Sequence, residues 1–386
     1  MLYRKTEEFD SFLCVADKCP ETCCAGWQIM IDEDSLDYYG EVEGEFGTRL
    51  RNSIDWQEGC FYQNAGRCAF LNDKNLCDLY TALGENALCE TCTRYPRHVE
   101  EFDGVREWSL SLSCPIVAQQ ILTRTDKAQI IEYETDEEED IDEFEDFDIL
   151  MYTQLEDARD VCVRILQDRN LTIQQRMEVL MRFATELQAC ITEERYNELQ
   201  DVTEKFSDID YGSRQDFASY LPWDEEEKRA LFQIVDSLER LREDWDEVLD
   251  EMYETLYAED GSSTENTDSD IMETTTDEAP GANSFEEGAW TEFDPEIMSE
   301  QLLFFFVFTY FNGAVYDDMI YSKMALAVYS TAFIRELWKA AYLQKKDTLS
   351  TAEMVRLAYR YAREIEHSDE NLNQLEDIFM ERIVDN

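Results

Sequence analysis

Apolar residues recur every three or four positions through much of the chain beyond residue 149, which is the spacing of one face of an α-helix. One predicted helix carries the apolar positions from Met151 to Ile165, and the next carries those from Met177 to Leu187. Further helices are predicted over residues 226–258, 295–312, 318–344, 351–366 and 371–383. Strand-like alternation is scarce. The predicted fold class is therefore mainly α, with a cysteine-rich, metal-binding N-terminal region packed with a helical C-terminal domain.

Two polar segments interrupt this pattern. Residues 132–148 contain 12 acidic side chains among 17 positions and no basic one, which is typical of a solvated linker. Residues 260–292 are rich in Ser, Thr, Asp and Glu and are expected to form a disordered insertion. The predicted organisation is a cysteine-rich region (1–131), an acidic linker (132–148), a helical region (149–259), the insertion (260–292) and a C-terminal helical region (293–386).

Charge changes the list of expected partners. The 386 residues include 33 basic and 89 acidic side chains, for a formal net charge of −56. Nucleic acids and anionic membrane surfaces would be repelled, so neither is an expected partner, whereas a cationic one is. Acidity also promotes solubility, so charge alone does not identify a partner. The first residues lack the apolar stretch of a signal peptide, no apolar run is long enough to span a bilayer, and a cytoplasmic location is expected.

Ten of the 12 cysteines lie between Cys14 and Cys114, and the other two lie in predicted helices. Intracellular cysteines rarely form disulfides, so a dense group predicts a metal site. Thiolates select zinc, copper(I) or iron–sulfur clusters, and a chain with only two histidines favours a sulfur-only site. The first-choice ligands are Cys68, Cys77, Cys89 and Cys92, followed by Cys14, Cys19, Cys23 and Cys24; Cys60 and Cys114 also remain candidates.

The order of several short motifs resembles the flagellin lysine N-methylase family. The N-terminal motifs are Phe12-x-Cys14-x4-Cys19-x3-Cys23-Cys24-x-Gly26-Trp27, Cys68-Ala69-Phe70-Leu71, Leu88-Cys89, Thr91-Cys92, Tyr95-Pro96-Arg97 and Ser113-Cys114-Pro115. The C-terminal motifs are Tyr310-Phe311, Tyr316-Asp317 and Ile365-Glu366-His367-Ser368. The N-terminal part is also similar to zinc- or iron-chelating cysteine-cluster proteins.

The resemblance implies an enzyme, a protein-lysine N-methyltransferase that transfers methyl groups from S-adenosylmethionine to lysines of flagellin. It further implies an iron–sulfur cluster of four irons held by cysteines, with zinc as the alternative metal. Methyl transfer requires a neutral lysine amine, so Tyr316, Asp317, Glu366 and His367 in the matched C-terminal motifs are the catalytic candidates. The sequence has no glycine-rich loop after a strand, so the residues that bind the methyl donor stay unassigned.

Two non-enzymatic interpretations remain open from the residues alone. The cysteines would serve equally well in a zinc- or iron-binding module that docks a partner. The acidic surface would also suit an export-linked protein that holds a cationic client without chemistry.

Overall fold

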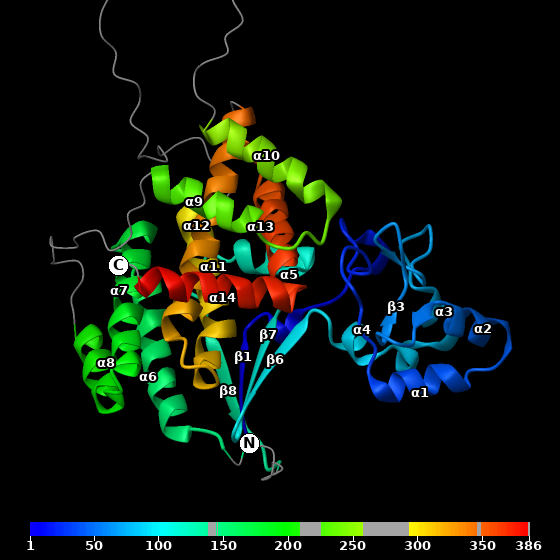
Figure 1. Cartoon of the computed structure of the whole chain (residues 1–386), viewed down its shortest axis with the longest axis horizontal. Helices are drawn as coiled ribbons and strands as arrows, with labels where there is room; N and C mark the ends of the chain where they lie inside the picture. Colours follow the sequence, from blue (N-terminus) through cyan, green and yellow to red (C-terminus); the bar gives the residue numbers. More distant parts are fainter. Residues whose placement is uncertain (138–143, 145, 209–224, 258–292, 346–348, 385–386) are drawn as a thin grey trace, which may run out of the picture.

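The computed structural model describes the chain except for residues 138–143, 145, 209–224, 258–292, 346–348 and 385–386. It consists of a helical body, a four-stranded sheet at one side of that body, and a smaller lobe that projects beyond the sheet (Figure 1). The lobe comprises residues 13–96 and contains nine of the 12 cysteines. We refer to these parts as the body, the sheet and the cysteine lobe.

The sheet joins the start of the chain to the strands that follow the lobe. Its order is β6-β7-β1-β8, with β1 parallel to β7 and the other neighbours antiparallel. Alternate residues of a strand face opposite sides. Glu107 and Ser109 of β7 are buried toward the helices, whereas Arg106 and Trp108 are only partly buried on the other side. The strands are β1 (Leu2–Thr6), β6 (Arg97–Phe102), β7 (Val105–Leu110) and β8 (Ile130–Glu134).

Short elements make up the cysteine lobe. Two-residue strands pair into two small hairpins, and the helices are no longer than nine residues. Its elements are η2 (Ala16–Lys18), α1 (Glu33–Glu41), α2 (Gly44–Asn52), β2 (Ile54–Asp55), β3 (Cys60–Phe61), β4 (Gln63–Asn64), β5 (Arg67–Cys68), α3 (Asp78–Leu83), η3 (Glu85–Ala87) and α4 (Glu90–Arg94). The short turn η1 (Phe9–Ser11) connects β1 to the lobe.

Long helices build the body around α11 and α12, which are buried along almost their whole length. A helix that is apolar on all sides is expected at the centre of a large core. The elements are α5 (Pro115–Leu122), α6 (Ile149–Leu166), α7 (Ile173–Thr192), η4 (Tyr196–Glu198), α8 (Leu199–Ser207), α9 (Glu225–Asp236), α10 (Glu243–Tyr257), α11 (Pro295–Tyr310), η6 (Phe311–Val315), α12 (Ile320–Lys345), α13 (Thr351–Glu366) and α14 (Asp369–Val384).

The mainly helical fold class is confirmed, and most predicted helices lie within a few residues of those observed. The single helix predicted over 226–258 is wrong, because α9 ends at Asp236 and α10 begins at Glu243. Arg240 ends α9 by donating hydrogen bonds to the carbonyls of Val235, Asp236 and Leu238. Strand β8 occupies the first residues of the predicted acidic linker, whereas the whole predicted insertion (260–292) lies outside the described residues.

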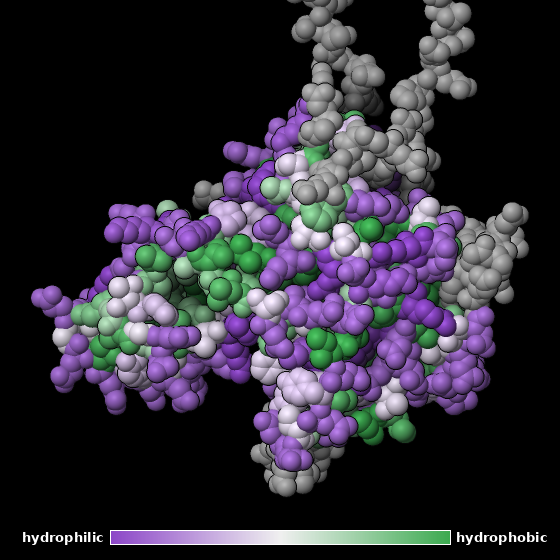
Figure 2. Space-filling model, turned by 180° about the vertical axis from the view of Figure 1, so that it is seen from behind, coloured by the Kyte–Doolittle hydropathy of each residue, from purple (hydrophilic) through white to green (hydrophobic). Residues whose placement is uncertain are grey.

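Surface character differs between the two parts. Seen from behind, the body is mostly hydrophilic, and hydrophobic residues gather on the lobe and where the lobe joins the body (Figure 2). Several large apolar side chains of the lobe are exposed, namely Leu13, Met30, Tyr38, Trp56, Tyr62 and Tyr80. In the described part of the chain, no helix is both long enough and apolar enough to cross a membrane.

Candidate functional site

Five cysteines lie together in the core of the lobe. Cys68 and Cys89 are buried, and Cys24, Cys77 and Cys92 pack against the same apolar cluster. We call these five residues the lobe thiol group. All four first-choice metal ligands from the sequence belong to it, and Cys24 joins them.

Backbone pairing brings the lobe thiol group together from separate stretches of sequence. The Cys68 amide donates to the Cys24 carbonyl at 2.9 Å, and Leu71 forms an isolated β-bridge with Cys77. Cys89 is the N-cap of α4, so Cys92 lies one turn further along the same helix. Helical residues three apart share a face, and this pair therefore presents two thiols side by side.

Hydrogen bonds between thiols decide which of them ionise first. The hydrogen bond from Cys92 lowers the pKa of Cys89, whereas the same contact and burial raise the pKa of Cys92. The hydrogen bond from Cys23 lowers the pKa of Cys24 to about 7 despite burial, with help from Thr22 and Arg67. Because the thiolate is the form that binds metal, Cys24 and Cys89 are the thiols best prepared for coordination.

Four other cysteines approach each other where the lobe meets the body. A hydrogen bond with Cys24, burial, and then the charges of Cys24, Cys14 and Cys114 raise the pKa of Cys23. Burial raises the pKa of Cys114, and the charges of Cys19 and Cys14 add to the effect. We call Cys14, Cys19, Cys23 and Cys114 the junction thiol group.

The structure thus divides the second predicted set of ligands between two places. Cys14, Cys19 and Cys23 lie at the junction, whereas Cys24 faces into the lobe, and Cys114 from the start of α5 completes the junction thiol group. Cys23 and Cys24 are neighbours in a turn and share a thiol hydrogen bond, so the two thiol groups meet at this pair.

Cys60 belongs to neither thiol group. It is buried in β3, where its sulfur accepts a hydrogen bond from Gln28 Nε2 at 2.9 Å. Within the described residues, no cluster of three or more histidine, cysteine, aspartate or glutamate side chains already has the arrangement of a metal-ion site.

Arg363 of α13 fastens the junction. Its side chain is 2% exposed, and Nε donates to the Ser113 carbonyl at 2.9 Å. The other two nitrogens donate to the carbonyls of Glu21 and Thr22 at 3.1 and 3.3 Å. One guanidinium therefore ties the loop that carries Cys19 and Cys23 to the residue before Cys114.

Glu366 holds the other side of the loop before Cys114. One carboxylate oxygen accepts the Ser113 amide at 2.7 Å and the Ser111 hydroxyl at 2.9 Å, and the other accepts the Tyr310 hydroxyl at 3.2 Å. Burial raises the pKa of Glu366, and these hydrogen bonds partly oppose the rise. With its acceptor sites occupied, this carboxylate positions the loop rather than facing an open site.

His367 extends the same polar junction. Its Nε2 atom lies 2.9 Å from the Ser113 hydroxyl, and its ring stacks on Trp27 with centroids 4.4 Å apart. Burial, aided by Arg363, lowers the pKa of His367 to about 3. The ring is consequently neutral at physiological pH and is a weak base.

Two of the four catalytic candidates lie elsewhere. Tyr316 is 56% exposed, and its hydroxyl donates to the Glu101 carbonyl. Asp317 pairs with Lys323 at 2.8 Å, and Lys323 also pairs with Glu376. The structure brings Glu366 and His367 together beside Ser113 but does not bring Tyr316 and Asp317 to them.

Several residues of the junction have no recognisable signal in the sequence. Nothing in the sequence distinguishes Arg363, Ser111 or Ser113, because a single arginine or serine has no distinctive spacing. Arg363 and Glu366 do lie three residues apart, which places them on the same face of one helix. Only the packing of α13 against the loop shows that both contact the same serine.

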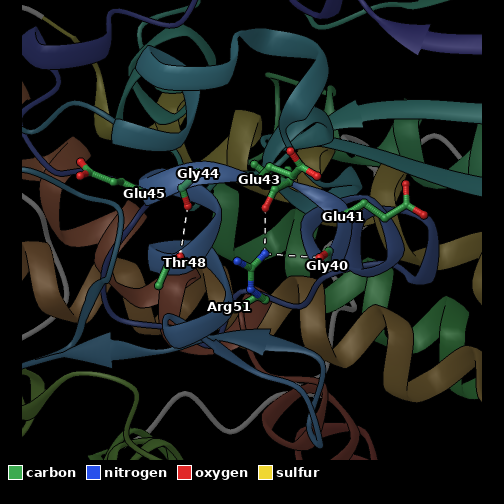
Figure 3. Close-up of a pocket in the computed structure, with 8 residues that line it drawn as sticks. Gly40, Glu41, Glu43, Gly44, Glu45, Thr48 and Arg51 are labelled. Carbon is green, nitrogen blue, oxygen red and sulfur yellow. Dashed lines mark hydrogen bonds between the residues drawn. The ribbon is translucent and has the colours of Figure 1, made fainter.

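A large surface hollow of about 730 Å³ lies at the far end of the lobe and contains neither cysteine nor histidine (Figure 3). Arg51 spans it by donating to the carbonyls of Gly40 and Val42 at 3.4 and 2.8 Å. These contacts close the turn between α1 and α2. The hollow is therefore a structural feature of that turn and does not belong to the thiol site.

Comparison with known proteins agrees with the resemblance in the sequence. Residues 159–386 match the family described as FliB lysine N-methylase C-terminal domain. The flagellar biosynthetic protein FliU of Salmonella muenchen is 30% identical over 124 residues, which cover 30% of this chain and 73% of that protein.

A lysine-N-methylase of Salmonella typhimurium is 28% identical over 130 residues, which cover 31% of this chain and 32% of that protein. The chain thus spans about a third of the length of that relative. No solved structure matches the chain. The family match covers α7 to α14 and includes Arg363, Glu366 and His367. On this evidence the chain belongs to the FliB lysine N-methylase family.

Proposed function

We propose that this protein is a lysine N-methylase that transfers methyl groups from S-adenosylmethionine to flagellin and carries a cysteine-bound iron–sulfur cluster. The observation that carries the proposal is the match of residues 159–386 to the lysine N-methylase family. A relative named as a flagellar biosynthetic protein supports a flagellar substrate. The net charge of −56 would favour encounter with a substrate that presents lysines.

The thiol chemistry supports the iron–sulfur part of the proposal. Both histidines are already engaged, His98 with Glu100 at 2.8 Å and His367 with Ser113 at 2.9 Å, which leaves sulfur as the main soft donor. Four-cysteine sets are the usual ligands of four-iron clusters. The lobe thiol group fits this requirement, with Cys68, Cys77, Cys89 and Cys92 as the first-choice ligands and Cys24 as the fifth thiol available.

Charge around these thiols also fits a negatively charged metal centre. Arg67 lies close enough to Cys24 to lower its pKa, and Arg363 acts in the same direction on Cys19. Positive charge beside a thiolate-bound cluster offsets its negative charge. Zinc is the alternative metal for the same ligands.

Glu366 and His367 act as positioning residues in this proposal. They fix Ser111 and Ser113, and through them the loop that presents Cys114 to the junction. The weak basicity of His367 makes it unsuitable for taking a proton from lysine.

A second candidate function is a metal-binding module that docks a partner without methylating it. The observation in its favour is that both thiol groups lie entirely before residue 159, outside the segment matched by the methylase family.

Coexpression with flagellin tests the proposal directly. Mass spectrometry of flagellin made with and without this protein is expected to show increments of about 14 daltons on lysines only when the protein is present. Anaerobically purified protein is expected to contain iron and acid-labile sulfide. Unmodified flagellin, together with protein that contains an intact cluster, would reject the methylase proposal and favour the metal-binding module. Colourless protein with stoichiometric zinc would reject the iron–sulfur cluster.

A further inference from the structure

A pocket of about 220 Å³ opens on the side of the sheet that faces away from the helices. Strand register explains its lining, because Arg106 pairs with Glu101 on one side and with Tyr3 on the other, and Trp108 follows two residues later on the same face. Arg94 and Arg97 complete the wall from α4 and the start of β6.

Three arginines in one pocket are unusual in a chain with 33 basic and 89 acidic residues. Arg94 pairs with Glu90 at 2.5 Å, and Arg106 pairs with Glu101 at 3.5 Å. Arg97 forms no ion pair with a carboxylate of the described residues. Its guanidinium lies instead over the rings of Phe9 and Phe12, at 5.9 and 5.6 Å from their centroids.

The pocket also offers flat aromatic surface and one carboxylate. Tyr3 and Trp108 lie 6.4 Å apart, and Phe9 meets Trp108 edge-on at 5.1 Å. The Glu101 side chain is about half exposed in the same lining. An arginine without a carboxylate partner suits the carboxylate of a free α-amino acid, and a nearby glutamate suits its amino group. The two aromatic rings suit a planar base joined to that amino acid.

We propose that this pocket binds the amino-acid end of the methyl donor, with Arg97 receiving the α-carboxylate and Glu101 the α-amino group. The inference rests on the proposed function. A lysine within a protein has no free α-carboxylate, so of the two substrates only S-adenosylmethionine carries one. The guanidinium fork matches a carboxylate in two parallel hydrogen bonds, and an aromatic face at the rim suits the adenine ring.

The size and place of the pocket agree with this assignment. Whole small-molecule sites occupy roughly 300–1,000 Å³, so the pocket encloses one end of the donor and leaves the rest at its rim. Two parts of its wall are close in sequence to members of the thiol groups. Arg94 belongs to the helix that carries Cys92, and Phe12 under Arg97 lies two residues before Cys14.

Equilibrium dialysis with S-adenosylhomocysteine tests the assignment on the purified full chain. The compound lacks the transferable methyl group, so binding is measured without turnover. Replacing Arg97→Leu is expected to weaken binding roughly 10- to 100-fold, the usual loss for a charge-assisted pair. Arg195→Leu is the matched control, because Arg195 pairs with Glu193 and Glu198 on the surface of the body. Unchanged affinity in folded Arg97→Leu protein would overturn the assignment.

A second measurement uses unaltered protein and therefore does not depend on how a variant folds. 5′-Methylthioadenosine keeps the base and the sulfur but has no amino-acid end, and it is expected to bind roughly 10- to 100-fold more weakly than S-adenosylhomocysteine. Equal binding of the two compounds would contradict the assignment. Free methionine that binds as tightly as S-adenosylhomocysteine would also contradict it, because the pocket would then recognise amino acids without the nucleoside.

The outcome separates this inference from the proposed function. Methylation of flagellin by Arg97→Leu protein with an unchanged KM for the donor would refute the pocket assignment and leave the methylase proposal intact. Specific binding of S-adenosylhomocysteine through Arg97, combined with unmodified flagellin, would support the pocket and refute flagellin as substrate.

Discussion

The cysteine lobe and the helical body reach stability by different means. The body contains a 26-residue central helix, α12, and a continuous apolar cluster that extends from β7 to α14. The lobe has helices of five to nine residues, two-residue strands and a small apolar cluster in which cysteines take part. Apolar burial alone suffices for a large core, whereas small units usually need cross-links or metals.

This contrast gives the cysteines a structural meaning besides a chemical one. A metal bound by residues from separate strands and helices contributes its binding free energy to folding. The lobe thiol group comes from four stretches of chain. A metal centre shared by these cysteines would therefore stabilise the fold of the lobe as well as provide its chemistry. The body needs no such link, since Cys162 and Cys190 are buried among apolar side chains in α6 and α7.

The largest effect is expected from removing the thiol pair of α4. The variant with Cys89→Ser and Cys92→Ser is expected to lose the metal. It would also lose the free energy that metal binding contributes to folding, on the order of 10 kcal/mol. Hydrogen exchange should show amides of the lobe losing protection while those of α11 and α12 keep theirs. Cys162→Ser and Cys190→Ser are the controls and should retain the metal. A lobe that remains protected in metal-free protein would show that its apolar cluster is sufficient.

A cavity in the body should lower stability without affecting metal binding. Phe306→Ala removes a fully buried ring from α11 and is expected to lower the free energy of unfolding by about 3–5 kcal/mol. Metal content per folded chain should be unchanged, because Phe306 lies in the apolar cluster of the body. Chemical denaturation and metal analysis measure the two effects. The control is Leu343→Ala, which shortens a side chain that is 46% exposed; equal losses in both variants would argue against a packed centre.

Arg363 connects the two regions, so replacing it should affect both. Arg363→Met leaves the carbonyls of Glu21, Thr22 and Ser113 without their buried donor, at an expected cost of about 3 kcal/mol. Hydrogen exchange should increase at residues 19–24 and 111–114. Arg356→Met, on the same helix but only partly buried, is the matched control. Exchange that rises equally throughout the lobe would show that Arg363 does more than fasten the junction.

The smallest predicted effect depends on pH and belongs to the body. Burial raises the pKa of Glu364 to about 7, although Arg240, Arg242 and Arg360 oppose the rise. The folded state thus holds a proton that the unfolded state releases near pH 4.5, and stability from this group falls as pH rises from 4.5 through 7.

Glu364→Gln removes this penalty and keeps an acceptor for the Leu241 amide. The variant should be more stable than the parent by up to about 3 kcal/mol at pH 8 and nearly equal to it at pH 4.5. Thermal or denaturant unfolding at the two pH values gives the comparison. A stabilisation of the same size at both values would trace the effect to packing rather than to ionisation.

The sequence by itself determined the helices of the body and the concentration of cysteines. The periodic apolar residues predicted the observed bounds of α13, and they predicted α6, α7 and α12 to within a few residues of their observed bounds. Such predictions succeed because the contacts of a helix repeat locally along the sequence. The four-stranded sheet was not predicted, since β1 pairs with strands about 100 and 130 residues away, and local patterns carry little information about such pairing.

Only the tertiary structure decided which cysteines belong to the lobe thiol group and which to the junction thiol group. Sequence spacing grouped Cys24 with Cys23, but packing turns Cys24 into the lobe and brings Cys114 to the junction from the start of α5. The same packing assembled Arg363 and Glu366 around Ser113 and gathered three arginines beside Trp108. Residue type fixes which chemistry a side chain offers, whereas its partners depend on contacts between distant parts of the chain, which spacing does not encode.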